Sequence, residues 1–213
     1  MTTPAASTYA YRSTDGAHTD AYLWTTVERI LAESIASDRR VFDLGCGNGT
    51  LARHLGKLGY EVYGVDPSEE GISQARIADP ETRLRIGSAY DPLSETYGMF
   101  PAVISLEVVE HVYSPRLYAR CVYDLLEPGG VAIISTPYHG YLKNLALSLL
   151  GKWDWHFTAL WDHGHIKFWS IATLTSLFQE QGMTLERVHR VGRIPALAKS
   201  MILTFRKPER VLP

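Results

Sequence analysis

The sequence predicts an α/β fold with a doubly wound, mostly parallel sheet. Short apolar runs, such as 41–44 and 61–65, alternate with segments of helical periodicity. The first apolar run leads into a glycine-rich loop, and a helical period follows that loop directly. The 213 residues contain no linker rich in proline, glycine or serine. We therefore expect one domain over 1–213.

The glycine-rich loop indicates a ligand site. It contains Asp43, Gly45, Cys46, Gly47, Asn48 and Gly49, and the helix begins near Leu51. Glycine is favoured where the backbone takes a positive φ or approaches a ligand closely, and the first turn of a helix presents free N–H groups. A ligand is therefore expected at the carboxyl end of the first strand.

A second strand, at 61–65, ends in Asp66. This residue lies about 20 positions after the first glycine, the spacing at which a carboxylate binds the hydroxyl groups of a ribose. The dinucleotide-binding pattern places its glycines two and then three residues apart, whereas Gly45, Gly47 and Gly49 alternate. The spacing argues against a nicotinamide-dependent oxidoreductase. A nicotinamide-dependent oxidoreductase and a non-catalytic cofactor-binding module stay as alternative functions.

With Asp43 before the first glycine, the two motifs resemble the class I S-adenosylmethionine-dependent methyltransferases over about residues 20–206. The resemblance implies a Rossmann-like sheet of seven strands in the order 3-2-1-4-5-7-6, the last antiparallel. It also implies S-adenosylmethionine as cofactor. The cofactor-binding residues it implies are Asp43, Gly45, Cys46, Gly47, Asn48, Gly49, Asp66, Pro67, Ser88, Ala89, Tyr90, Leu106 and Glu107.

Ser88 departs from the family pattern, in which an acidic residue at this place binds the adenine amino group. Three groups are candidates for that contact: the Ser88 hydroxyl, a backbone carbonyl and the carboxylate of Asp91. Tyr90 is a candidate to stack on the adenine ring.

The remaining elements follow from periodicity and breakers. We expect strands at 83–86, 102–106, 131–135, 183–190 and 199–206, and helices at 115–126 and 170–181, with Ser68 capping another helix and a Glu-Pro-Gly-Gly turn at 127–130. The segment 9–36 contains a helix and the candidate ligand-contacting residues Tyr11, Arg12 and His18. It is either an N-terminal lid over the cofactor, as in the resembled family, or a helix that covers the sheet.

An insertion at 137–169 follows the fifth strand. It holds four of the five tryptophans and four of the eight histidines. Loops at the carboxyl edge of an α/β sheet commonly set substrate specificity, so this segment is expected to form a substrate lid. Its apolar helix at 141–150 carries Lys143 and is followed by Lys152. An apolar helix flanked by basic residues is also typical of peripheral membrane contact, which would here involve 140–155. A self-packed lid, a wall for an aromatic acceptor and a membrane contact are the three interpretations.

Two carboxylates and a histidine follow the fourth strand. If a helix begins directly after Glu107, then Glu107, Glu110 and His111 share one face. Such a cluster is a site for magnesium, manganese or, with more histidine, zinc, and His163 or His165 of the insertion is a further candidate ligand. Alternatively, His111 is a catalytic base supported by Glu107. The third interpretation is a capped helix with a packed histidine.

The phrase Leu106 to Val112 resembles the ubiquinone-pathway O-methyltransferases and their bacterial relatives. This resemblance implies an O-methyltransferase that acts on a small phenolic or quinol acceptor. A similar arrangement in small-RNA 3′-end methyltransferases implies the alternative of an RNA-end or other nucleic-acid acceptor.

The composition limits the kinds of binding partner and the cellular compartment that we expect. The formal net charge is −2, from 21 basic and 23 acidic residues, so the chain carries no strong nucleic-acid signal. The two cysteines, Cys46 and Cys121, form neither a disulfide framework nor a metal-spaced pair. Residues 1–10 lack the pattern of a signal peptide, and we expect a cytoplasmic protein. The sequence leaves the oligomeric state open.

Overall fold

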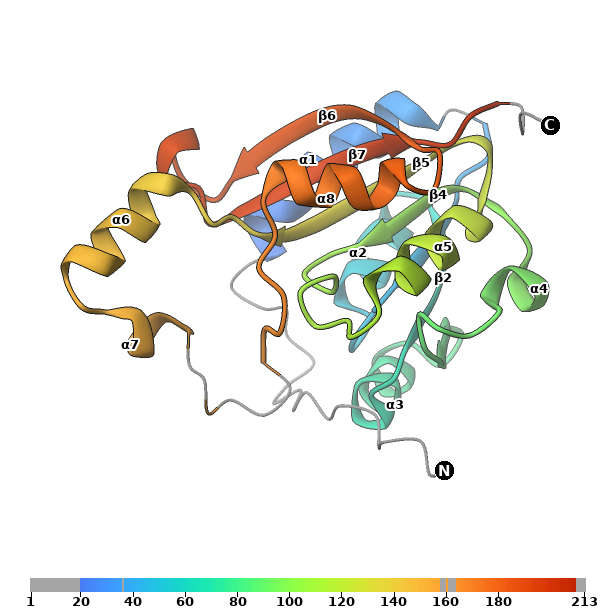
Figure 1. Cartoon of the computed structure of the whole chain (residues 1–213). Coiled ribbons are helices and arrows are strands. Elements are labelled where there is room, and N and C mark those ends of the chain that lie inside the picture. Colours follow the sequence, from blue (N-terminus) through green and yellow to red (C-terminus); the bar gives the residue numbers. More distant parts are fainter. Residues whose placement is uncertain (1–19, 36, 158–159, 161–163, 210–213) are drawn as a thin grey trace, which may run out of the picture.

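The computed structural model describes residues 20–35, 37–157, 160 and 164–209 (Figure 1). The predicted lid residues Tyr11, Arg12 and His18, and His163 of the insertion, lie outside the described residues. The elements in chain order are α1 Asp20–Ser34, β1 Arg40–Leu44, α2 Thr50–Lys57, β2 Glu61–Asp66, α3 Glu69–Ala78, β3 Arg83–Ile86, α4 Leu93–Tyr97, β4 Phe100–Ser105, α5 Pro115–Leu125, β5 Leu126–Pro137, α6 Tyr141–Leu149, α7 Trp153–Phe157, α8 Ile171–Gln179, β6 Thr184–Val191, the 3-10 helix η1 Pro195–Leu197 and β7 Ser200–Arg206.

The strands form one seven-stranded sheet in the order β3-β2-β1-β4-β5-β7-β6. β1 pairs in parallel with β2 and β4, and β7 runs antiparallel to both β5 and β6. The predicted order and the antiparallel last strand are therefore confirmed. After β3 the chain crosses back to the other side of β1, so β1 and β4 flank the switch point at which sheets of this kind bind ligands.

Helices cover both faces of the sheet, and the strands alternate their side chains between two cores (Figure 1). Phe42 on β1 faces the core shared with α5 and α8, whereas Val41 faces the core shared with α1, α2 and α3. The same alternation divides β4 and β5. The two cores hold the sheet rigid beneath the loops at its carboxyl edge.

Helix α1 packs against the sheet through the side chains that the sequence placed on one face. Val27 and Leu31 are fully buried, and Ile30 and Ile35 are also buried. These residues join the core formed with α2 and α3. The described part of the segment 9–36 thus packs as a helix against the sheet, and whether the segment also forms a lid over the cofactor stays a prediction.

Strand β5 is longer than predicted. The Glu-Pro-Gly-Gly segment 127–130 was expected to be only a turn, but Leu126 already pairs with Phe100, and Val131 pairs with Ala102. Residues 127–130 therefore form an irregularity within the strand opposite Pro101, where Gly129 takes a φ of 77°. The local turn signals mark this irregularity correctly, but they do not reveal that β5 pairs with β4 both before and after it.

The insertion forms α6 and α7, which extend away from the sheet (Figure 1). The predicted apolar helix is confirmed as α6, and none of its residues is buried. Among the described residues, we find no helix whose length and apolar character would let it cross a membrane.

Candidate active site

The glycine-rich loop connects β1 to α2 at the carboxyl edge of the sheet. Gly45, Gly47 and Gly49 all take positive φ values, of 88°, 54° and 74°. The backbone N–H groups of Gly45 and Cys46 donate to the carbonyl oxygen of Val65 at 2.8 and 3.1 Å, which fastens the loop to β2. A Cβ atom on Gly45 would lie 2.4 Å from Cγ2 of Val108, so glycine is needed there for space as well as for conformation.

Asp66 lies at the tip of β2 beside this loop. Its Oδ2 accepts a hydrogen bond from the N–H of Gly47 at 2.9 Å, and its Oδ1 accepts one from the N–H of Ser68 at 2.8 Å. Ser68 caps α3, as predicted, by accepting from the N–H of Gly71. These bonds fix the carboxylate between the loop and the start of α3, at the place where the sequence predicts a contact with the cofactor ribose.

Two buried carboxyl groups give the loop an unusual electrostatic environment. Asp43 on β1 is only 3 % exposed, and burial, followed by the charge of Asp66, raises its pKa to about 7. Burial also raises the pKa of Asp66 and raises that of the Cys46 thiol well above its ordinary value. A buried thiol with a raised pKa is a poor nucleophile, which agrees with Cys46 as a small loop residue.

Asn48 and the segment 88–90 complete the predicted cofactor region. Asn48 is buried; its side-chain oxygen accepts from the Thr50 hydroxyl at 3.2 Å. Ser88 lies in a tight turn, in which its N–H donates to Asp91 at 2.7 Å and its hydroxyl oxygen accepts from the N–H of Tyr90 at 3.2 Å. The Tyr90 hydroxyl in turn accepts from the N–H of Ser114, so this turn is tied to the loop after β4. Pro67 is exposed, and Ala89 and Leu106 are half-buried.

Glu107 follows β4 in a strained conformation. Its φ of 55° is the only positive value at a non-glycine position among the described residues. Ser135 accounts for the conformation: the Glu107 N–H donates to the Ser135 hydroxyl oxygen at 2.9 Å, and the hydroxyl donates to the Glu107 carboxylate at 2.7 Å. Burial raises the Glu107 pKa to about 7, although the Ser135 and Ser200 hydroxyls oppose that rise.

The helix that would place Glu107, Glu110 and His111 on one face does not form. Residues 109–111 form an isolated turn, and α5 begins only at Pro115. Glu107 therefore does not share a helical face with Glu110 and His111. Its carboxylate is held by Ser135 and is not one of the converging ligand atoms, although it lies close enough for its charge to act on Glu110.

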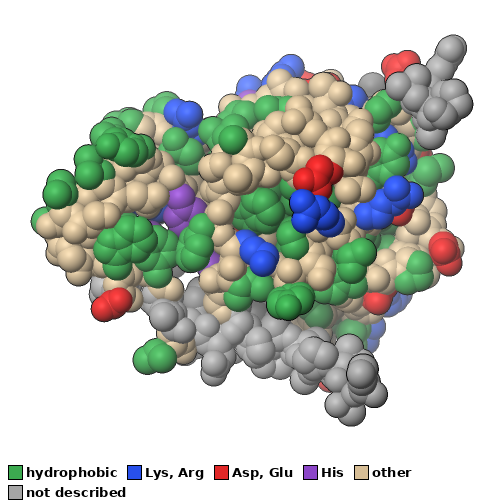
Figure 2. Space-filling model, in the orientation of Figure 1, with side chains coloured by type: hydrophobic (Ala, Val, Ile, Leu, Met, Phe, Trp, Pro, Cys, Tyr) green, Lys and Arg blue, Asp and Glu red, His purple; other side chains and the backbone are tan. Residues whose placement is uncertain are grey.

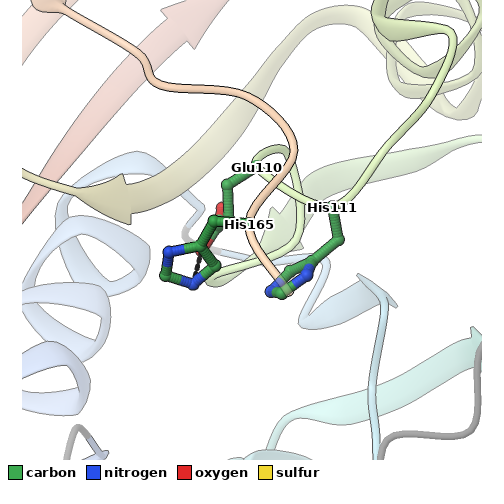
Figure 3. Close-up of side chains that lie close together, drawn as sticks. All are labelled: Glu110, His111 and His165. Carbon is green, nitrogen blue, oxygen red and sulfur yellow. Dashed lines mark ion pairs between the residues drawn. The ribbon is translucent and has the colours of Figure 1, made fainter. Parts of the chain in front are cut away.

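Glu110, His111 and His165 converge at this turn (Figure 3). One potential ligand atom from each lies within 4.8 Å of the others, and Nε2 of His165 is 4.0 Å from Oε1 of Glu110. The two imidazole rings are 4.9 Å apart. Three of the four predicted metal ligands are thus brought together, from positions 54 residues apart in the chain (165 − 111).

Backbone hydrogen bonds bring His165 to this place. The N–H groups of Ile166 and Lys167 both donate to the carbonyl oxygen of Glu110 at 3.0 Å. The indole N–H of Trp169 donates to the carbonyl oxygen of Val109 at 3.0 Å. These three bonds attach the end of the insertion to the turn after β4.

The cluster fits a divalent cation. Glu110 is 1 % exposed, and neither carboxylate oxygen accepts a hydrogen bond of standard geometry from a described residue. Burial, with the charge of Glu107, raises its pKa well above the ordinary value, while the backbone N–H of Glu110 itself and the nearby Thr136 hydroxyl act in the opposite sense. Such an orphaned buried carboxylate is costly without a positive partner.

The histidines fit the same interpretation. Nδ1 of His111 bonds the carbonyl oxygen of Gly164 at 3.2 Å, so Nε2 is the nitrogen that would bind a cation. Burial, followed by the charges of His111, His156 and Lys143, lowers the pKa of His165 to about 4. A neutral imidazole is the form that binds metals. One carboxylate and two imidazoles suit manganese or zinc better than magnesium.

Sequence reasoning missed Ser135, Ser200 and Gly164. Ser135 holds Glu107, the Ser200 hydroxyl acts on the pKa of Glu107, and Gly164 orients His111. Ser135 was placed at the end of the fifth strand, next to the expected cofactor edge, which was a signal that a polar residue there contacts the site. No local pattern marks Ser200 or Gly164, because their contacts depend on the order of the strands and on the path of the insertion.

The fold, the alternating glycines and Asp66 define a class I S-adenosylmethionine-dependent methyltransferase domain. The chain belongs to this family: the family model described as "Methyltransferase domain" matches residues 17–188. Among solved structures, it resembles an S-adenosylmethionine-dependent methyltransferase from Mesorhizobium loti, with a TM-score of 0.63 and 20% identity over 84% of this chain and 96% of that one. At that identity the likeness concerns the fold alone.

Two curated relatives are ubiquinone biosynthesis O-methyltransferases. The chain is 36% identical to the protein of Ruegeria pomeroyi, over 72% of this chain and 62% of that protein. It is 31% identical to the human mitochondrial protein, over 70% of this chain and 42% of that protein. The chain thus spans about half the length of these relatives.

Proposed function

We propose that this chain transfers a methyl group from S-adenosylmethionine to an oxygen atom of a small phenolic or quinol acceptor, held at Glu110, His111 and His165 by a divalent cation. The observation that carries the proposal is the orphaned, buried carboxylate of Glu110 beside two histidines, immediately after β4. The glycine loop follows the neighbouring strand β1, so the two sites share one edge of the sheet. The names and identities of the relatives support the class of acceptor.

S-adenosylmethionine, when bound, supplies an electrophilic methyl group attached to sulfur. Asp66 would accept hydrogen bonds from the ribose hydroxyls, because its carboxylate is oriented by the N–H groups of Gly47 and Ser68. The positive φ values of Gly45, Gly47 and Gly49 let the loop pass close to the ligand. The chain therefore fixes one reactant at the tips of β1 and β2.

A divalent cation at the cluster would supply a positive charge that lowers the pKa of an acceptor hydroxyl and orients two neighbouring oxygen atoms. Glu110, His111 and His165 would hold it. Glu107, whose own pKa is raised to about 7 by burial, stands beside the cluster as an acceptor for the hydroxyl proton. The protein's contribution is then alignment of the oxygen with the methyl group and removal of one proton.

A substrate panel tests the proposal. The chain should methylate catechols or quinols from labelled S-adenosylmethionine, excess chelator should abolish transfer, and manganese should restore it. Calorimetry with S-adenosylhomocysteine should show unchanged cofactor binding in chelator. Manganese binding, followed by electron paramagnetic resonance, should be lost in Glu110→Gln and retained in the control Glu81→Gln, an exposed position.

The outcomes separate the alternatives. Full transfer in excess chelator, together with an inactive His111→Ala variant, would replace the cation with His111 as the base. Transfer to the 3′ end of RNA but to no catechol or quinol would contradict the small-molecule acceptor. Binding of a nicotinamide dinucleotide in place of S-adenosylhomocysteine would contradict the cofactor.

A further inference from the structure

Hydroxyl groups from three elements gather behind the carboxylate of Glu107. Figure 2 shows acidic side chains spread over the outer surface of the molecule. Glu107 differs from those residues, because its backbone φ is 55° and the Ser135 hydroxyl donates to its Oε1 at 2.7 Å. A strained backbone conformation persists only where the surrounding contacts fix it. Further contacts that hold Glu107, besides those of Ser135, are therefore expected.

Ser200 on β7 brings a second hydroxyl group to this carboxylate. β7 runs antiparallel to β5 with Ser200 opposite Pro137, so Ser135 and Ser200 lie on neighbouring strands and on the same face of the sheet. Ser200 is 2 % exposed. Burial raises the pKa of Glu107, and the Ser135 and Ser200 hydroxyls oppose that rise, which is the effect of hydroxyl groups that donate to the ionised carboxylate. Two serines, one from each strand, thus act on the same carboxylate.

Tyr22, in the first turn of α1, extends this arrangement to a helix. Its Oη lies 3.2 Å from Oγ of Ser200. α1 packs on the same face of the sheet, where Leu23 shares a core with Ile202 of β7. The Tyr22 side chain is half-buried, and Nζ of Lys199 lies 5.6 Å from the centroid of its ring. The hydroxyl group of Tyr22 is thus held over the first residue of β7.

The number of protons on each hydroxyl group sets the direction of the bonds. A hydroxyl group has one proton to donate and two lone pairs that accept. Because Ser200 uses its single proton for Glu107, Tyr22 is the donor in the bond between Tyr22 and Ser200. Each bond in such a chain polarises the next and strengthens it. Loss of the Tyr22 hydroxyl group therefore weakens the contact between Ser200 and Glu107.

We propose that Tyr22 and Ser200 are positioning residues that orient the Glu107 carboxylate toward the methyl acceptor. Ser135 fixes the carboxylate from β5, and Ser200, itself oriented by Tyr22, fixes it from β7. The inference rests on the proposed function, in which Glu107 accepts the proton of the acceptor hydroxyl. A reacting group that is misplaced by about 1 Å can slow a reaction by about a hundredfold. Loss of either hydroxyl group should therefore lower kcat rather than raise KM.

Methyl transfer from labelled S-adenosylmethionine to catechol, by the full chain with manganese present, tests the inference. Tyr22→Phe removes only a hydroxyl group and should lower kcat by about threefold to tenfold, and Ser200→Ala should lower it by about tenfold or more. The KM values for S-adenosylmethionine and for catechol should each change by less than about twofold. The double variant should be no slower than Ser200→Ala, because the Tyr22 hydroxyl acts only through Ser200.

Two matched replacements are the controls. Tyr97→Phe removes the hydroxyl group of another half-buried tyrosine, which lies in α4 against Phe42. Ser176→Ala removes the hydroxyl group of an exposed serine that donates within its own helix, α8. Both should transfer methyl groups at the rate of the unmodified chain. A thermal shift with S-adenosylhomocysteine should be retained in all the variants, which shows that each is folded.

Urea unfolding tests the hydrogen-bond chain without any methyl transfer. Tyr22→Phe should lower the urea midpoint by less in a Glu107→Gln background than in the unmodified chain, because a neutral amide oxygen is a weaker acceptor than a carboxylate. If this coupling is present but the unmodified chain does not methylate catechol, the chain of bonds is supported and the proposed function is contradicted. The two failures can thus be told apart.

Three results would overturn the inference. The first is an unchanged kcat in Tyr22→Phe or in Ser200→Ala. The second is a double variant whose loss of kcat is the product of the two single losses, which would mean that the two hydroxyl groups act separately. The third is a midpoint shift for Tyr22→Phe that is the same with Glu107→Gln, which would show that Tyr22 does not act on Glu107.

Discussion

Replacement of the buried Asp43 by asparagine should change how stability depends on pH. The Asp43 pKa is raised from 3.8 to about 7, chiefly by burial. In the unfolded chain the carboxyl group loses its proton near its ordinary pKa, whereas in the folded chain it keeps the proton up to about pH 7. The unfolded state therefore binds fewer protons in this range, and the free energy of unfolding falls as pH rises.

The size of the effect follows from the difference in pKa. A difference of about three pH units corresponds to about 4 kcal/mol, and we expect about 2–4 kcal/mol. Below the pKa of the unfolded chain, the ionisation of Asp43 does not change the free energy of unfolding. Above about pH 7, the full cost of burying the ionised carboxylate lowers that free energy. Asp43→Asn removes the titration, so the variant should gain about 2–4 kcal/mol over the unmodified chain between about pH 4 and pH 8.

Urea unfolding of the ligand-free chain at several pH values measures this gain. Asparagine at this site can change the free energy of unfolding by an amount that is the same at every pH. The change of the difference with pH does not contain that constant amount. Asp154→Asn makes the same replacement at an exposed position and is the control. A pH-independent difference for Asp43→Asn would show that Asp43 is ionised in the folded chain, and the reasoning from burial would be refuted.

Three further predictions concern the loop, the cofactor and the insertion. Gly45→Ala should lower the free energy of unfolding by about 2–4 kcal/mol, because the new Cβ meets Val108 and the φ is positive. Gly151→Ala, which has a positive φ but no atom within 4 Å, should cost only about 1–2 kcal/mol in urea unfolding. Asp66→Ala should weaken S-adenosylmethionine binding by about 1–3 kcal/mol in calorimetry, and unchanged binding would contradict the ribose contact. Amide hydrogens of α6, which buries no residue, should exchange faster than those of β1 and β4, and equal protection would contradict a weakly packed insertion.

The cofactor half of the fold could be predicted residue by residue because its signals are local. The strand at Val41, the glycine loop and the cap at Ser68 each depend on neighbours within about five positions along the chain. Burial of alternate strand residues and a tight turn leave the backbone few conformations. The periodicity of the sequence is therefore enough to predict these elements. The order of the strands came instead from the resemblance to a family.

The candidate metal cluster could be predicted only in part. Glu110, His111 and His165 were named from residue type, but the reason given, a helix after Glu107, was wrong. The backbone at Glu107 takes a positive φ because Ser135 bonds both its N–H and its carboxylate. That contact joins residues 28 positions apart, one just after β4 and one on β5. It depends on the register of β4 and β5, which the local sequence does not specify.

The hydrogen bonds between the end of the insertion and the turn after β4 fix the position of His165 independently of the residues upstream in the insertion. Ile166 and Lys167 attach through their backbone N–H groups to a backbone carbonyl, so the attachment does not depend on which side chains they carry. His165 keeps its place as long as the chain path there is kept. The stretch 141–157 upstream is then free to exchange residues, and even to change length, without displacing His165. Residues in that stretch can therefore diversify while the positions of Glu110, His111 and His165 relative to one another stay fixed.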